Sequence, residues 1–281
     1  MSDYLHPETL VDADWVAQHT DDANIRLIDV DEDTGAYEKG HIRNAVGWNW
    51  FTDLHDPVRR DYVDEAGLSR LLQQSGVGPD TTVVLYGGNN NWFAAYAYWL
   101  SRYLGFDAVK LLDGGRKKWE LDGRELTQEV PTFPPTDLRV TGLVRGELRG
   151  LRDEVLATLG QDELIDVRSP EEYRGERLPP EYLPQRQARA ERQVQGHLPG
   201  AVNIPWSKAV NDDGTFRAAD ELYDLYEGEG IGPDRGVIAY CRIGERSAYT
   251  WFVLHELLGY RSVKNYDGPW TEYGSLVGAQ R

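Results

Sequence analysis

The only cysteine of the chain, Cys241, lies in a stretch whose residues could serve a nucleophile. The apolar run from Val237 to Tyr240 precedes it and predicts a buried strand. A polar loop with Gly244 follows, and Ser247 opens an apolar-rich run that predicts a helix ending at Gly259. A thiol between such a strand and such a helix faces unpaired backbone N–H groups and the positive end of the helix dipole, which both favour an anion.

Two arginines, Arg242 and Arg246, add positive charge to the same loop. Cysteines in such surroundings have pKa values from roughly 3.5 to 7.5, against about 8.5 for a free thiol. A lone cysteine after an apolar strand is more often a buried core residue, but a core residue does not need a glycine-bearing loop with two arginines beside it. We therefore predict that Cys241 is a thiolate nucleophile that acts on an anionic substrate.

The composition is that of a globular protein with a strongly acidic surface. The chain has 281 residues, of which 40% are hydrophobic and 27% are charged, and its formal net charge is −17. This length favours two domains, and the negative charge disfavours binding to nucleic acid or to anionic membranes. An anionic substrate then needs a locally positive site, which the two arginines could supply. The sequence does not indicate an oligomeric state.

Cysteine usage and hydropathy indicate where the protein works. A single cysteine excludes an intramolecular disulfide and fits a reducing compartment. The first residues show neither the basic nor the apolar region of a signal peptide. No apolar run reaches the roughly 18 residues that a membrane span requires. We therefore expect a cytoplasmic protein.

The sequence contains the same unit twice. Short motifs such as Leu-Ile-Asp-Val and Gly-x-Gly-Pro-Asp occur once in each half and in the same order. The matching segments are 27–30 and 164–167, 40–46 and 196–202, 76–80 and 230–234, and 83–86 and 237–240. From residue 76 onward the offset between the halves is a constant 154 residues. A period this long indicates duplicated domains rather than a solenoid.

Each half alternates short apolar strands with helices, which predicts an α/β fold of two tandem domains, each a mainly parallel sheet flanked by helices. The predicted helices are 12–19 (with Asp12 as N-cap), 68–74, 92–104 and 151–159, and the predicted strands include 27–30, 83–86 and 109–112. We expect an N-terminal domain at 1–125, a Pro-containing linker at 126–146 and a C-terminal domain at 147–281. The second half also carries an insertion, 178–195, which we expect to lie on the surface near the site.

Aligning the two halves puts Gly87 opposite Cys241. The loop at 87–92 has no thiol and no ionisable residue, so the first half keeps the strand–loop–helix geometry without a nucleophile. We expect this half to be a structural partner that shapes the active cleft of the other half. The alternative is that the glycine- and asparagine-rich loop binds a small anion through backbone N–H groups.

Two pairs of polar residues recur in both halves, although only one half has a thiol. His41 and His197 fall in matching turns, so we expect a shared structural role. Asp29 and Asp166 recur in matching strands, where we expect hydrogen bonds at the strand ends. Six histidines and one cysteine show no metal-ligand spacing, and we expect no metal or organic cofactor.

The order of these motifs, together with Cys-Arg-Ile-Gly-Glu-Arg at a strand-to-helix loop, resembles the rhodanese family, and within it the tandem-domain thiosulfate sulfurtransferases. The resemblance covers nearly the whole chain apart from the linker and the insertion. It implies an inactive N-terminal domain packed against a catalytic C-terminal one. It further implies that Cys241 takes the sulfane sulfur of thiosulfate as a persulfide, releases sulfite, and passes the sulfur to cyanide or a thiol.

The resemblance also implies roles for the residues around the catalytic Cys241. Backbone N–H groups of the active-site loop would cradle the thiolate and then the persulfide. Arginine side chains would hold the sulfonate oxygens through charge-assisted hydrogen bonds. The predicted substrate-binding residues are Arg242, Arg246 and Arg168, and the other predicted loop residues are Ile243, Gly244, Glu245 and Ser247.

The chain departs from the family pattern at two positions. Members that prefer thiosulfate commonly have a lysine two residues after the cysteine, where this chain has Ile243, and Arg246 is the expected substitute. Another family arginine is replaced near Glu172, and Arg174 or an insertion residue is the candidate to serve instead. Mercaptopyruvate-specific members typically have a small residue directly after the cysteine. The presence of Arg242 there favours thiosulfate, with 3-mercaptopyruvate sulfurtransferase as the alternative.

Two further functions are alternatives. Phosphatases and arsenate reductases of related fold use a Cys-x5-Arg loop, but the sixth residue after Cys241 is Ser247, and Arg246 comes one place early. A non-catalytic binding or sulfur-carrier module is the alternative from a different class. A gain of one sulfur atom on Cys241 after incubation with thiosulfate distinguishes a transferase from a module that only binds a partner.

Overall fold

The computed structural model describes residues 3–59, 61–160, 164–177 and 194–276. The chain divides into two compact units. The first unit consists of Pro7–Arg145 and Asn211–Phe216, and the second of Met1–His6, Gly146–Val210 and Arg217–Arg281. Among the helices of the described residues, none has the length and apolarity that a membrane crossing requires.

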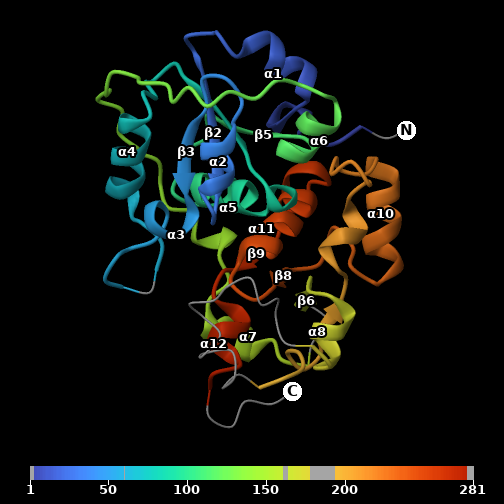
Figure 1. The fold of residues 1–281 in the computed structure, drawn as a ribbon. Helices are drawn as coiled ribbons and strands as arrows, with labels where there is room; N and C mark the ends of the chain where they lie inside the picture. Colours follow the sequence, from blue (N-terminus) through green and yellow to red (C-terminus); the bar gives the residue numbers. More distant parts are fainter. Residues whose placement is uncertain (1–2, 60, 161–163, 178–193, 277–281) are drawn as a thin grey trace. The chain divides into compact units, whose positions relative to one another are not determined.

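The first unit is built on a five-stranded sheet in which all pairings are parallel, with the order β1-β5-β4-β2-β3. Figure 1 labels its strands β2, β3 and β5. Its strands are β1 (Leu10–Val11), β2 (Ile25–Asp31), β3 (Val46–Asn49), β4 (Thr82–Tyr86) and β5 (Val109–Leu112). Its α-helices are α1 (Ala13–His19), α2 (Gly35–Lys39), α3 (Trp50–Asp53), α4 (Glu65–Gln74), α5 (Trp92–Tyr103) and α6 (Gly115–Leu121). Short 3-10 turns, η1 (Pro7–Thr9) and η2 (Asn89–Asn91), precede β1 and α5.

The core of the first unit explains its sequence pattern. In β2 every residue after Ile25 is buried, as expected for a parallel strand covered on both faces. Val16 of α1 and Trp119 of α6 pack in one cluster with Tyr86 of β4, and α5 packs against β2, β4 and β5. The predicted N-cap is confirmed, because the Asp12 side chain accepts a hydrogen bond from the Trp15 N–H at 2.7 Å.

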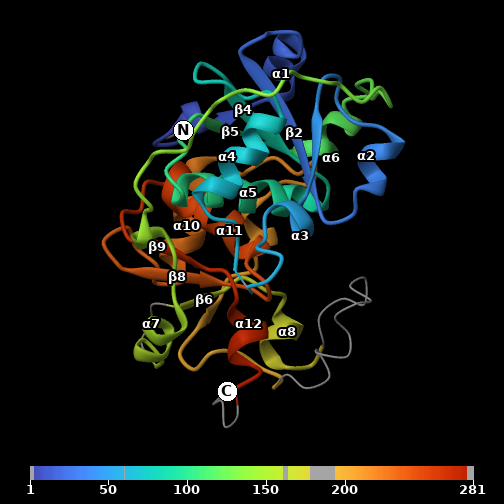
Figure 2. The ribbon, with the colours of Figure 1, turned by 90° about the vertical axis from the view of Figure 1, so that its left-hand side faces the viewer.

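The second unit repeats this arrangement with a four-stranded parallel sheet in the order β7-β6-β8-β9, which corresponds to β3-β2-β4-β5 of the first unit. Its strands are β6 (Leu164–Asp166), β7 (Val202–Asn203), β8 (Val237–Tyr240) and β9 (Val263–Tyr266). Its helices are η3 (Gly146–Leu148), α7 (Arg152–Ala157), α8 (Pro170–Arg174), η5 (Trp206–Ala209), α10 (Ala219–Gly228), α11 (Glu245–Phe252), the π-helical turn η6 (Val253–Leu257) and α12 (Pro269–Tyr273). Helix α11 packs against β8 and β9 (Figure 2).

The predicted elements are present, with small shifts at their ends. The clearest difference is at α11, which begins at Glu245 rather than at Ser247. Its N-cap is Gly244, which takes a left-handed conformation (φ 100°). The predicted helix continues to Leu257 through a π-helical turn and stops before Gly259 (φ 70°). The early start of α11 places Glu245 in its first turn.

The predicted linker belongs to the first unit over most of its length. The Phe133 ring lies 3.2 Å from the Arg26 guanidinium carbon, and the Gln73 side chain donates to the Leu138 carbonyl at 2.7 Å. Of the predicted insertion, residues 178–193 lie outside the described residues.

A buried aspartate–arginine pair recurs in both units. In the first unit, Arg116 donates to Asp29 at 2.5 Å and to the Gly40 carbonyl at 2.6 Å. In the second unit, Arg168 donates to both carboxylate oxygens of Asp166. Arg168 also donates to the Gly196 carbonyl at 2.8 Å, and Gly196 matches Gly40 in the repeat. Each pair therefore connects the strand that carries the aspartate, β2 or β6, to the turn that carries the recurring histidine.

The arginine of this pair comes from a different position in each unit. The repeat aligns Arg116 with Trp270, and Arg168 with Asp31. In the second unit the Trp270 ring lies 4.5 Å from the guanidinium carbon of Arg168. The equivalent buried carboxylates of the two units are thus paired with arginines from unrelated positions in the repeat. The recurring histidines have the shared structural role that was predicted: each ring stacks on a tyrosine and bonds the carbonyl of that tyrosine.

We predict that Arg116→Met destabilises the first unit by about 3–5 kcal/mol, because it leaves the Asp29 carboxylate buried without its charge partner. Urea unfolding followed by tryptophan fluorescence measures the loss. Arg124→Met is the matched control: its partner Asp14 is largely exposed, so the loss is about 1 kcal/mol or less. Equal losses in the two variants would contradict the prediction, and Asp29→Asn added to Arg116→Met should recover part of the stability.

Candidate active site

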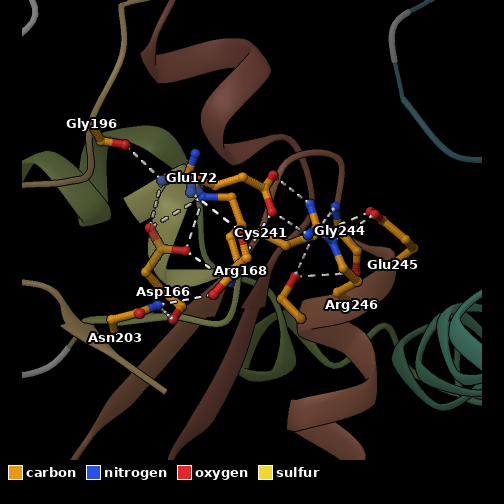
Figure 3. A network of polar contacts seen from close by, with 11 residues as sticks. Asp166, Arg168, Glu172, Gly196, Asn203, Cys241, Gly244, Glu245 and Arg246 are labelled. Carbon is orange, nitrogen blue, oxygen red and sulfur yellow. Dashed lines mark hydrogen bonds and ion pairs between the residues drawn. The ribbon is translucent and has the colours of Figure 1, made fainter. Parts of the chain in front are cut away.

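Cys241 follows β8 and precedes α11, at the carboxyl end of the sheet (Figure 3). The loop between them lies close to Asp267, the residue that follows β9. A Cβ atom on Gly244 would lie 2.7 Å from the Cα atom of Asp267, and the φ of 100° is unfavourable for other residues. Glycine is therefore required at this position, and it aims the backbone N–H of the loop at the sulfur.

The Cys241 side chain is buried, and groups from Gly244 and from the first turn of α11 contact its sulfur. The Gly244 N–H donates to Sγ at 3.1 Å, and the Ser247 hydroxyl lies 3.6 Å from Sγ. The thiol in turn donates to Glu245 Oε2 at 3.2 Å. The sulfur therefore lies among polar groups, in agreement with its predicted position at a helix N-terminus, and a carboxylate is one of those groups.

The predicted lowering of the Cys241 pKa is wrong. Burial, and after it the negative charge of Glu245, raises the pKa of the thiol to about 11, although Arg246 and Ser247 act in the opposite direction. The sequence argument considered the helix N-terminus and the arginines, but not the loss of water around the sulfur or the neighbouring carboxylate. In this structure the resting side chain is a thiol rather than a thiolate.

The positive charge of Arg246 is shared by two buried carboxylates. Its guanidinium donates to both oxygens of Glu172 in α8, at 2.8 and 3.2 Å, and its Nε donates to Glu245 Oε1 at 3.2 Å (Figure 3). Burial alone would raise the pKa of Glu172, but the charge and hydrogen bonds of Arg246 outweigh it and leave this pKa below its ordinary value. Arg246 therefore links Glu172 to the carboxylate that contacts the sulfur.

The other predicted substrate-binding residues lie in different surroundings. Arg242 is buried, and its carbonyl accepts a hydrogen bond from the Thr271 N–H at 3.3 Å. Arg168 makes the buried pair with Asp166 described above. Because the first unit makes the same pair without a thiol, these contacts of Arg168 belong to the scaffold. Arg174, the suggested substitute, makes exposed ion pairs with neighbouring glutamates.

Sequence reasoning missed the roles of two glutamates. Glu245 was predicted only as a loop residue, and Glu172 only as a replaced arginine. A carboxylate in the first turn of the helix that follows the cysteine loop could have indicated the first. The pairing of Glu172 with Arg246 joins residues 74 positions apart, and no local signal in one sequence marks it.

The matching loop of the first unit cannot hold a thiol. A Cβ atom on Gly87 would lie 2.3 Å from the Val30 carbonyl oxygen, so any side chain there requires the backbone to move. The Asn91 side chain, which the repeat aligns with Glu245, accepts a hydrogen bond from the Gly87 N–H at 2.9 Å. This loop is thus closed by its own amide side chain at the place where the second unit has its sulfur.

Known proteins resemble the chain over nearly its whole length. The rhodanese-like domain family matches residues 12–122 and 151–276. A provisionally named thiosulfate sulfurtransferase of Mycolicibacterium smegmatis is 54% identical, with 97% of this chain and 96% of the relative covered. The sulfur carrier protein TtuD of Thermus thermophilus is 51% identical, with 98% and 96% covered.

A solved structure agrees with these matches. The crystal structure of SseA from Escherichia coli, described as a 3-mercaptopyruvate sulfotransferase with the rhodanese fold, has a TM-score of 0.75 at 26% identity. The likeness covers 93% of this chain and 98% of SseA. At this coverage it extends over both α/β units described above. With its two matched domains and its full-length relatives, the chain belongs to the rhodanese family.

Proposed function

We propose that the chain is a sulfurtransferase that moves the sulfane sulfur of thiosulfate to cyanide or a thiol through a persulfide on Cys241. The position of one atom carries this proposal: Sγ of the only cysteine lies at the start of α11, 3.1 Å from the Gly244 backbone nitrogen. The 54% identity to the M. smegmatis relative supports thiosulfate as the donor.

The proposed reaction has two halves. In the first half, the Cys241 sulfur attacks the outer sulfur of thiosulfate, a new S–S bond forms, and the bond to the inner sulfur breaks, so that sulfite leaves with the electron pair. In the second half, cyanide or a thiolate attacks the outer sulfur of the persulfide, and the electron pair of the S–S bond returns to Sγ. The sulfur atom moves without an external oxidant or reductant.

The loop supplies donors for the charge that develops on sulfur. The Gly244 N–H and the Ser247 hydroxyl face Sγ, and donors fixed in advance stabilise charge that forms during a reaction. For the sulfonate oxygens we propose Arg242 and Arg246 as ligands. Arg246 must then exchange one of its carboxylate contacts for the substrate, because its described hydrogen bonds go to Glu172 and Glu245.

Two competing functions share the same site. 3-Mercaptopyruvate is the competing donor, in view of the likeness to SseA, and we favour thiosulfate because Arg242 rather than a small residue follows Cys241. A sulfur carrier, as the Thermus relative is named, would accept the sulfur and deliver it to a partner protein rather than to a small acceptor. The cytoplasmic location stays a prediction.

We predict that the protein gains one sulfur atom on Cys241 after incubation with thiosulfate, and gains it faster than with 3-mercaptopyruvate. Intact mass spectrometry detects the added atom, and subsequent cyanide should remove it as thiocyanate. Cys241→Ser is the control, since no other cysteine is present. An unchanged mass in the wild-type protein with both donors would overturn the proposed function.

The raised thiol pKa gives a pH prediction. Because burial and Glu245 raise the pKa of Cys241 to about 11, the thiol is protonated at neutral pH. Its alkylation by iodoacetamide should become about tenfold faster per pH unit up to about pH 10, instead of levelling near 8.5 as for a free thiol. The urea-unfolded chain is the matched control. A plateau of the folded protein below pH 8.5 would contradict this prediction.

The first unit should not be convertible into a catalytic one by a single thiol. We predict that Gly87→Cys in the Cys241→Ala background transfers no sulfur from thiosulfate to cyanide, because its Cβ would meet the Val30 carbonyl oxygen at 2.3 Å. Thiocyanate formation is the measurement, with Cys241→Ala alone as the baseline. Formation above this baseline would show that the first loop can carry the chemistry.

A further inference from the structure

A carboxylate contacts the sulfur of Cys241 directly. Glu245 Oε2 accepts the thiol hydrogen bond at 3.2 Å, and the whole arrangement is buried. The other oxygen of the same carboxylate accepts from Arg246 Nε at 3.2 Å. Figure 3 shows this chain of contacts running from the sulfur through Glu245 and Arg246 to Glu172. Glu245 is thus oriented with one oxygen toward the guanidinium and the other toward the thiol.

We propose that Glu245 is a catalytic residue that accepts the Cys241 proton when the sulfur attacks the donor and returns it when the transfer is complete. This assignment rests on the proposed sulfurtransferase function and adds a residue to it. A thiol that forms a bond through its own electron pair becomes strongly acidic, so its proton needs an acceptor within hydrogen-bond reach at that moment. Among the contacts described for Sγ, Glu245 supplies the carboxylate.

The atoms and charges of this sequence balance. As the bond between Sγ and the outer sulfur of thiosulfate forms, the thiol proton passes to Glu245, sulfite leaves with the electron pair of the broken bond, and the persulfide keeps one negative charge. When cyanide removes the outer sulfur as thiocyanate, the electron pair returns to Sγ. The Glu245 carboxyl then gives its proton back, and the thiol and carboxylate of the resting state are restored.

The neighbouring groups fit other tasks. The Gly244 N–H and the Ser247 hydroxyl point hydrogen-bond donors at Sγ and have no capacity to take its proton at neutral pH. Arg246 is a permanent cation, and the described contacts of Glu172 go to Arg246 and to the Ser169 backbone rather than to the sulfur. Among the contacts described for Sγ, the Gly244 and Ser247 groups donate hydrogen bonds to the sulfur, and the Glu245 carboxylate accepts one from the thiol.

The test compares Glu245→Gln with the wild-type protein in two measurements. Removing the negative charge beside the sulfur should lower the pKa of Cys241, measured from the ultraviolet absorbance of the thiolate. Sulfite release in the first turnover with thiosulfate at pH 7 should nevertheless become about 100-fold slower, the lower end of what a positioned proton acceptor contributes. This deficit should shrink as the pH rises and the thiolate forms in advance. A purely electrostatic role predicts the opposite, faster release from a more acidic thiol.

Glu172→Gln is the comparison variant, because it removes the other carboxylate from Arg246 and leaves the acceptor at the sulfur. It should lose less sulfite release than Glu245→Gln, and Glu245→Asp should recover part of the release that Glu245→Gln loses. Should Glu245→Gln fail to fold, the wild-type protein still tests the assignment: sulfite release should be slower in heavy water, and an unchanged rate would overturn it.

The outcomes separate the two proposals. Sulfite release by Glu245→Gln at pH 7 as fast as in the wild-type protein overturns the role of Glu245 and leaves the sulfurtransferase function in place. Equal losses in Glu172→Gln and Glu245→Gln also overturn it, because the effect then comes from the position of Arg246. Absence of sulfite release from the wild-type protein overturns the proposed function, and the role of Glu245 with it.

Discussion

Burial of the Cys241 sulfur and its hydrogen bond to the Glu245 carboxylate together determine the electrostatics of the site. A thiol at a helix N-terminus with arginines nearby ordinarily ionises readily. Here burial and the adjacent carboxylate keep the proton on sulfur. Arg246 and Glu172 extend the contact into a buried chain of alternating charges, which fixes the carboxylate in place. The proton shared between Cys241 and Glu245 therefore distinguishes this site from a loop in which the cysteine is already ionised at rest.

Much of the architecture could be predicted because it depends on local patterns and on repetition. The apolar strands and the capped helices follow from short-range signals such as Asp12 and Gly259. The duplication gave each half a second example, so that the strand before Cys241 could be recognised from its counterpart before Gly87. The position of the thiol at the start of a helix depends on the same signals, and it too was correctly predicted.

The electrostatics of the site could not be predicted in the same way, because they depend on which side chains meet after folding. The sequence places Arg246 near Cys241, but the structure shows that its guanidinium is bound to Glu172, from a helix 74 positions away. Arg168 was assigned to the substrate from its place in the family, and nothing in the sequence indicated that its guanidinium pairs with Asp166. A count of charges in a loop therefore gives their number but not their partners.

The two units show that the scaffold and the chemistry depend on different residues. Both keep a buried aspartate, an arginine and a glycine carbonyl, although Arg116 and Arg168 reach that place from different positions. The fold therefore requires an arginine beside the buried aspartate, but this arginine can come from different positions in the sequence. The loop that follows β4 or β8 lies outside this constraint, so one unit closes it with the Asn91 amide and the other places a thiol and a carboxylate there. The two loops can differ because the strand before each loop and the helix after it are stabilised by packing against the rest of their unit. In the first unit α5 packs on the sheet, and in the second α11 does so.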